Sequence, residues 1–78
     1  METIYNSGRC TIDRDGERLT FAVKDGDFAK SIDAPEWNAG MADEVHLGLY
    51  VAARAADKFD LLKHRIDEMM AFARGYIA

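Results

Sequence analysis

The residues of this sequence best suited to chemistry surround a histidine near the C-terminus. Asp60 stands four positions before His64, and Asp67 and Glu68 follow it at three and four positions. In a helix these side chains share one face, and an imidazole with carboxylates can hold a divalent metal. The same spacing is typical of a solvated helix face with i,i+4 ion pairs, and the other histidine lies eighteen positions earlier. We therefore expect no metal here and keep a metal-dependent enzyme at His64 only as an alternative.

The single cysteine is the other candidate for catalysis, with His46 or His64 as its base. Cys10 alternates with Ile12 on the apolar side of a predicted strand, so we expect a buried structural thiol. A lone cysteine fits a reducing compartment, which predicts a cytoplasmic protein. The sequence has no glycine-rich phosphate loop, no serine nucleophile elbow and no CxxC pair. We therefore predict that the protein is not an enzyme and takes no cofactor.

The elements that would position these residues begin with strands. Apolar and polar residues alternate over 19–24, which is the period of a half-buried strand. Asp15-Gly16 and Asp25-Gly26 flank this stretch, and Asp-Gly is favoured in hairpin turns because glycine readily adopts a positive φ. A weaker strand follows at 28–32. The sequence predicts a three-stranded antiparallel β-meander, in which residues 4 and 5 extend the first strand or add to its edge.

A short helix is predicted directly after the meander. Asp33 can cap this helix and Glu36 stands three positions later, as in a capping box. Ile32 and Trp37 have the spacing of a hydrophobic staple across the same helix start. Gly40 is the expected C-terminal end of the helix.

Two further helices, or one long helix, are predicted over the remaining residues. Residues 41–56 are strong helix formers with little polar face, which indicates burial on more than one side. Asp57 can cap a new amphipathic helix over 57–76. The apolar stripe of that helix contains Phe59, Leu62, Ile66, Met69, Ala73 and Tyr76. We favour a helical hairpin broken at 53–57, because average helices are much shorter than 35 residues. The prediction is one α+β domain over 1–78, with the meander in 1–33 and the helical half in 34–78.

Acidic residues are concentrated in the strand half of the chain. The net charge is −4, and residues 13–44 alone hold nine acidic and four basic residues, a net of −5. This charge argues against direct nucleic-acid binding, which needs Lys and Arg, and suits a basic protein partner. Plain solubility is the alternative reason for such a charge. The candidate partner-binding residues are Asp15, Asp25, Asp27, Asp33, Glu36, Trp37, Asp43 and Glu44, with Trp37 as an aromatic anchor.

Part of the chain resembles a family of small proteobacterial proteins of unknown function. The resemblance rests on residues 16–32 and 34–37, where strand, Asp-Gly corner, strand and short helix follow one another. A later helix of that family is matched by Phe59, Arg65, Ile66 and Ala73. The resemblance covers about half of the chain and implies no activity and no site. In size, acidity and lack of catalytic motifs, the chain is also similar in type to phage-encoded inhibitors such as anti-CRISPR proteins.

These observations favour a non-enzymatic, protein-binding module that acts stoichiometrically. Its acidic face would meet a basic, nucleic-acid-binding surface of the partner, as an inhibitor would. The alternative is a structural homo-oligomer, such as a homodimer formed through the 57–76 helix. No stretch approaches 18 consecutive apolar residues, and the N-terminus does not have the pattern of a signal peptide, so no membrane contact is expected.

Overall fold

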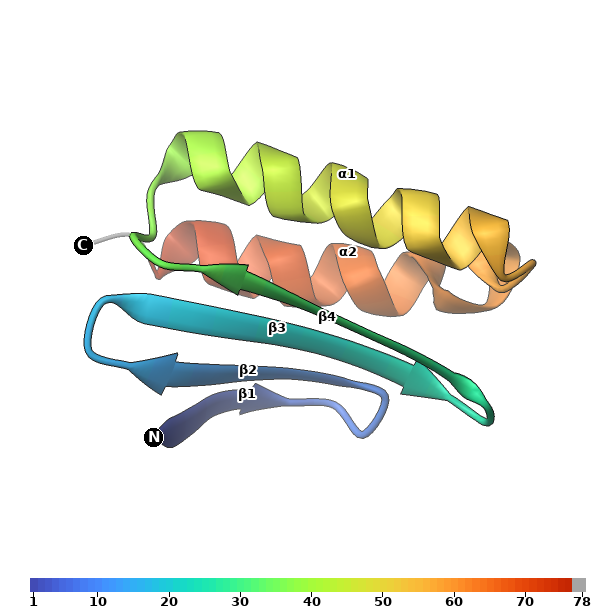
Figure 1. Ribbon diagram of the computed structural model, residues 1–78, viewed down its shortest axis with the longest axis horizontal. Coiled ribbons are helices and arrows are strands. Elements are labelled where there is room, and N and C mark those ends of the chain that lie inside the picture. The colour runs from blue at the N-terminus through green and yellow to red at the C-terminus, as the bar shows by residue number, and fades with distance from the viewer. Residues whose placement is uncertain (77–78) are drawn as a thin grey trace.

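An antiparallel sheet forms one layer of the molecule and a pair of helices forms the other (Figure 1). This computed structural model describes residues 1–76, so the last two residues of the predicted helical half lie outside the described part. The strands β1 (Glu2–Asn6), β2 (Cys10–Asp15), β3 (Arg18–Asp25) and β4 (Phe28–Ala34) lie in sequence order across the sheet. The helices α1 (Ala39–Ala55) and α2 (Phe59–Gly75) lie side by side over one face of it. The predicted α+β class, with a meander before the helices, is confirmed.

Both predicted Asp-Gly turns are confirmed. Gly16 has a φ of +65° and Gly26 a φ of +60°, values that a residue with a Cβ adopts only with strain. The two turns set the register of the central strands, in which Ile12 pairs with Phe21 and Phe21 with Ile32. The apolar side chains therefore lie on the face of the sheet that the helices cover.

The prediction of three strands is wrong by one, because Glu2–Asn6 forms a separate edge strand, β1, paired with β2. The chain turns back after β1 at Gly8, which has a φ of +88°. The register between the two strands shifts between Thr3 and Tyr5, as in a β-bulge. A bulge interrupts the period of two, so the alternation that identified the other strands is missing here. Of the two alternatives for residues 4 and 5, extension of the first strand or addition at its edge, the structure has the addition at the edge.

The predicted short helix after the meander is absent, and its capping box is wrong. Asp33 belongs to β4, where its carboxylate accepts a hydrogen bond from Thr20 at 2.9 Å and pairs with Arg18 at 3.4 Å. The cap is Asn38, whose side chain accepts from the backbone N–H of Met41 at 3.0 Å, so Gly40 lies in the first turn of α1. The Asp33 carboxylate binds residues of the neighbouring strand β3. A local sequence pattern does not reveal such a partner.

The helical hairpin is confirmed, but Asp57 is not the cap of its second helix. Asp57 has a φ of +57° and ends α1 instead. The backbone N–H groups of Asp57 and Lys58 donate to the carbonyls of Arg54 (3.1 Å) and Ala53 (2.8 Å). These two bonds form a Schellman motif, with aspartate in the position that glycine usually takes. The position before α2 is Lys58, which makes no side-chain capping bond.

One apolar core lies between the sheet and the two helices. Its buried members from the sheet are Cys10, Ile12, Leu19, Phe21, Val23 and Ala34. Those from the helices are Ala42, Val45, Leu49, Ala53, Leu62, Ile66, Met69, Met70 and Ala73. As expected from its small polar face, α1 packs both against the sheet, at β4, and against α2, although Leu47 and Val51 on its remaining face are 64% and 57% exposed. No helix within residues 1–76 is long and apolar enough to cross a membrane.

Candidate functional site

The structure divides the predicted acidic face between two ends of the molecule. Asp15 is the last residue of β2, and Asp33 and Glu36 lie at and just after the end of β4. Antiparallel pairing places these positions at one end, together with Glu17 in the β2–β3 turn. We call Asp15, Glu17, Asp33 and Glu36 the acidic end. This end also holds the beginning of α1 and the last turn of α2 (Figure 1).

At the opposite end, Asp25 is the last residue of β3 and Asp27 lies in the β3–β4 turn. The eight residues of β3 separate the two turns by roughly 26 Å at about 3.3 Å per residue. The Asp25 side chain is only 15% exposed and forms ion pairs with Arg9 and Lys58, both at 3.3 Å. Lys58 belongs to the connection between the helices, so Asp25 ties that connection to the sheet. It is thus placed as a structural residue, and Asp27 beside it is exposed.

Asp43 and Glu44 lie further along α1, outside the acidic end. The Asp43 carboxylate pairs with Arg74 of α2 at 3.2 Å, although its side chain is 82% exposed. Glu44 is exposed on the same helix. Of the eight candidates from the sequence, the structure therefore brings together Asp15, Asp33 and Glu36, with Trp37 next to them.

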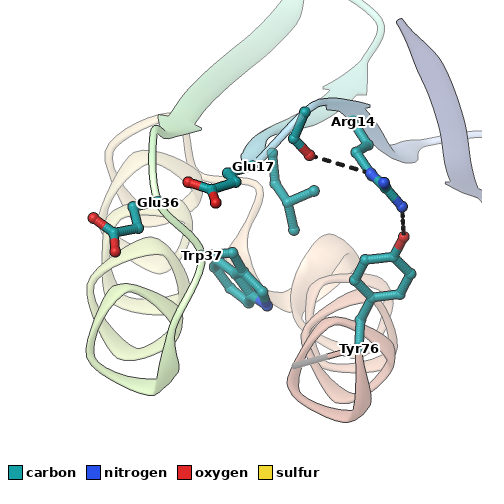
Figure 2. A pocket seen from close by; sticks show the side chains of 7 residues that line it. Arg14, Glu17, Glu36, Trp37 and Tyr76 are labelled. Atoms are coloured by element: carbon teal, nitrogen blue, oxygen red, sulfur yellow. Dashed lines mark hydrogen bonds between the residues drawn. The ribbon is translucent and has the colours of Figure 1, made fainter. Parts of the chain in front are cut away.

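A pocket of about 500 Å³ opens at the acidic end, between the β2–β3 turn, the β4–α1 connection and the end of α2. Its lining consists of Arg14, Gly16, Glu17, Leu19, Glu36, Trp37 and Tyr76. Figure 2 shows Glu17 and Glu36 on one side of the pocket, Arg14 and Tyr76 on the other, and Trp37 between the two sides. Five segments of the chain supply these residues, so only the folded molecule has the pocket.

The two sides of the pocket differ in how their charges are satisfied. Arg14 donates through Nε to the Gly16 carbonyl at 3.2 Å and through a terminal nitrogen to the Tyr76 hydroxyl at 2.7 Å. These bonds hold its guanidinium on its own side of the pocket. Within residues 1–76, the carboxylates of Glu17 and Glu36 take part in no ion pair. Two exposed carboxylates without a cation create a negative field at this side of the pocket.

Trp37 forms an aromatic part of the pocket and is anchored from behind. Its ring packs on Phe21 with centroids 5.0 Å apart, and its Nε1–H donates to the Ala73 carbonyl at 3.1 Å. The predicted staple with Ile32 across a helix start is therefore wrong, because no helix begins there. Since the indole N–H is already bonded, the part of the ring that lines the pocket offers its carbon surface to a ligand.

A second polar cluster lies in the seam between the helices. The Asp67 carboxylate accepts hydrogen bonds from Lys63 (2.8 Å), from His46 Nε2 (2.9 Å) and from the Tyr50 hydroxyl. A guanidinium can only donate, so Arg74, which lies 3.0 Å from His46 Nδ1, donates to it. His46 therefore bridges Arg74 and Asp67 through its two ring nitrogens. We call these five residues the helix seam: Asp67, Lys63, His46, Tyr50 and Arg74.

Hydrogen bonds within the helix seam shift the pKa values of three of its members, Asp67, Tyr50 and Lys63. Desolvation acts to raise the pKa of Asp67, but the bonds from Lys63, Tyr50 and His46 outweigh it and hold that pKa well below its usual range. The pKa of Tyr50 is raised by burial and by its bond to Asp67. The pKa of Lys63 is raised by its hydrogen bond to the same carboxylate. The cluster therefore satisfies its own charges and connects α1 to α2.

The residues suggested for metal binding or nucleophilic catalysis are not assembled into such a site. His64 pairs with Glu68 on an exposed face, whereas Asp67 is directed toward α1. Within the described residues no group of three His, Cys, Asp or Glu side chains is placed to hold a metal ion. Cys10 is fully buried, as predicted, and burial raises the pKa of its thiol.

The apolar stripe of α2 faces the core. Leu62, Ile66, Met69 and Ala73 are each 0% exposed, because the sheet and α1 cover them. These four residues of the predicted stripe therefore belong to the core, whereas Phe59 and Tyr76 at its two ends are partly exposed.

No known protein family, no curated protein and no solved structure matches the chain. The resemblance to small proteobacterial proteins therefore remains a prediction, and the pocket and its charges are the basis for the function proposed below.

Arg14 and Tyr76 are the pocket residues that sequence reasoning missed. They are 62 positions apart, and no local pattern connects a strand arginine with a tyrosine at the end of the last helix. Glu17 was counted within the acidic segment but not among the candidates. Its position directly after an Asp-Gly turn, where side chains are exposed, is a signal that could have identified it.

Proposed function

We propose that the protein is a non-enzymatic binding module whose acidic end contacts the basic surface of a protein partner. The supporting observation is the pocket there, in which Glu17 and Glu36 form no ion pair with any residue of 1–76 and lie beside Trp37. Asp15 extends the same negative end onto the sheet, whereas the charge of Asp33 there is paired with Arg18. Exposed carboxylates around an aromatic side chain suit a surface rich in lysine and arginine.

In its sharpest form, the proposal is a stoichiometric inhibitor of a nucleic-acid-binding protein. A surface that binds phosphates is basic, and an acidic end can occupy it in place of the nucleic acid. Phage-encoded inhibitors such as anti-CRISPR proteins are the type of protein that this form suggests. The proposal also predicts a cytoplasmic location, because such partners act there.

The test compares two variants that lose the same charge at different ends. Glu17→Gln/Glu36→Gln removes two negative charges at the pocket, and Asp27→Asn/Asp60→Asn removes two at the other end of the molecule. Wild-type protein is used to capture a binding protein from lysate, and the captured protein is purified. Its affinity for each variant is then measured, with a fluorescent oligonucleotide as competitor.

We expect the pocket double to lose about tenfold in affinity and the far-end double to lose less than twofold. Binding should weaken steeply with salt, because exposed charges are screened within about 8–10 Å at physiological ionic strength. The oligonucleotide should compete with the wild-type protein. Equal losses in both variants would show that net charge alone drives binding and would contradict the proposal. Undiminished binding in the pocket double would contradict it as well.

A further inference from the structure

The pocket at the acidic end is a cavity with a polarised lining, and this polarity restricts what it can hold. Glu17 and Glu36 make one side negative, while Arg14 occupies the other, fixed there by Gly16 and Tyr76. A phosphate or carboxylate on the first side would meet two like charges. A cationic group fits there, and the bound position of Arg14 keeps the chain's own guanidinium from reaching it.

The apolar lining of the pocket restricts the shape of a ligand. Leu19 is 2% exposed and Trp37 is half-buried, so these two residues contribute apolar and aromatic surface to the pocket. The Nε1–H of Trp37 is bonded to Ala73, so a ligand meets the π-system of the indole. A planar cation can stack on such a ring while its edge donates to carboxylates, and a guanidinium does both.

We propose that the pocket holds one arginine side chain of the basic partner, with its guanidinium against Trp37 and its N–H groups donating to Glu17 and Glu36. This inference rests on the proposed function and adds the chemistry of the anchoring residue. Arginine fits better than lysine, because its five donors form a planar fork that is more weakly hydrated than an ammonium group. The cavity of about 500 Å³ is large enough for one long side chain.

Trp37 makes the proposal directly measurable, because it is the single tryptophan of the chain and it lines the pocket. The probe is the capped tripeptide acetyl-Gly-Arg-Gly-amide, titrated against the full chain while tryptophan emission is recorded. The matched peptides carry citrulline, which has the shape of arginine without its charge, or lysine. We expect a saturable emission change with millimolar affinity for the arginine peptide. Affinity should be about fivefold weaker for the lysine peptide and weaker still for the citrulline peptide.

Three variants assign the response to the pocket. Glu17→Gln/Glu36→Gln should weaken binding of the arginine peptide by about fivefold to tenfold, whereas Asp27→Asn/Asp60→Asn should leave it within twofold. Arg14→Gln removes the like charge across the pocket and keeps a donor for Tyr76, so it should strengthen binding by about twofold. Circular dichroism of each variant confirms that it is folded.

Several results would overturn the inference. One is equal binding of the arginine and citrulline peptides, since a charge-independent response excludes the carboxylates. Another is an equal loss in the pocket and far-end doubles. A third is the absence of a saturable change at about 50 mM arginine peptide, which is about tenfold above the expected half-saturation of about 5 mM. The proposed function would survive these failures if the captured partner still distinguished the two doubles. In that case the acidic end binds without an arginine anchor.

Discussion

The helix seam and the pocket are both polar and partly exposed, but they differ in where their charges find partners. In the seam, Asp67 receives three hydrogen bonds from within the chain, and His46 bridges it to Arg74. In the pocket, Glu17 and Glu36 have no cationic partner among residues 1–76, although Arg14 lines the same cavity.

The difference indicates two roles for charged residues in one small fold. Charges that satisfy one another contribute to stability, because their removal leaves partners without hydrogen bonds. Charges without partners contribute little to stability and remain able to bind another molecule. The net charge of the chain could not distinguish the two groups, because each carboxylate counts equally in it.

The largest expected effect concerns the apolar layer beneath both regions. Ile66→Asp places a charge among fully buried side chains and should cost more than about 4 kcal/mol, close to the whole stability of a domain of this size. Leu61→Asp on the same helix, at a position that is 51% exposed, should cost less than about 1 kcal/mol. Urea unfolding followed by circular dichroism measures both. A folded Ile66→Asp protein would show that α2 does not pack as described.

The next largest loss of stability is expected when the carboxylate of Asp67 is removed from the helix seam. Asp67→Ala leaves the donors of Lys63, Tyr50 and His46 without their acceptor, and we expect a loss of about 2 kcal/mol in the free energy of unfolding. Glu44→Ala, an exposed site on α1, should change stability by less than about 0.5 kcal/mol and serves as control. If Asp67→Ala and Glu44→Ala changed the free energy of unfolding equally, the helix seam would contribute no more to stability than an exposed surface site.

Acid should remove the contribution of Asp67. The pKa of its carboxylate is lower in the folded protein than the value of about 3.9 expected in the unfolded chain, so its stabilising effect is fully present above about pH 5. The effect is lost progressively as the pH falls through the folded-state pKa. The stability difference between wild type and Asp67→Asn should therefore be smaller at pH 2.5 than at pH 7. A difference that is constant with pH would contradict the hydrogen-bond network of the seam.

The pocket carboxylates should have the smallest effect on stability. Glu17→Gln/Glu36→Gln should change the free energy of unfolding by less than about 0.5 kcal/mol, since neither side chain has a cationic partner among residues 1–76 and a like-charge repulsion is relieved. Thermal unfolding at low salt is the sensitive measurement. A loss above about 1 kcal/mol in the free energy of unfolding would show that these carboxylates stabilise the fold, as Asp67 does, and would contradict the proposed binding role.

Features that depend on neighbours in sequence were predicted well. The two Asp-Gly turns, the central strands and the helical hairpin follow from local turn chemistry and apolar period, and the structure has all of them. One error came from a partner distant in sequence, and another came from a local hydrogen-bonded motif at a helix end. Asp33 could cap a helix on local grounds, but Thr20 and Arg18 on β3 hold it in a strand. Asp57 resembled a helix cap, but the end of α1 places it in the left-handed region.

The sequence by itself determined the two Asp-Gly turns, the succession of a β-meander and a helical hairpin, and the excess of acid in the first half of the chain. Turn residues act through their own backbone preferences, and apolar periodicity acts over a few residues, so both can be read without a fold. Only the tertiary structure decided which acids meet. Strand pairing separates Asp25 from Asp33 by most of the length of β3, and the packing of α2 against β2 brings Tyr76 to Arg14. A site built from distant segments depends on those packing contacts, and these are absent from any local pattern.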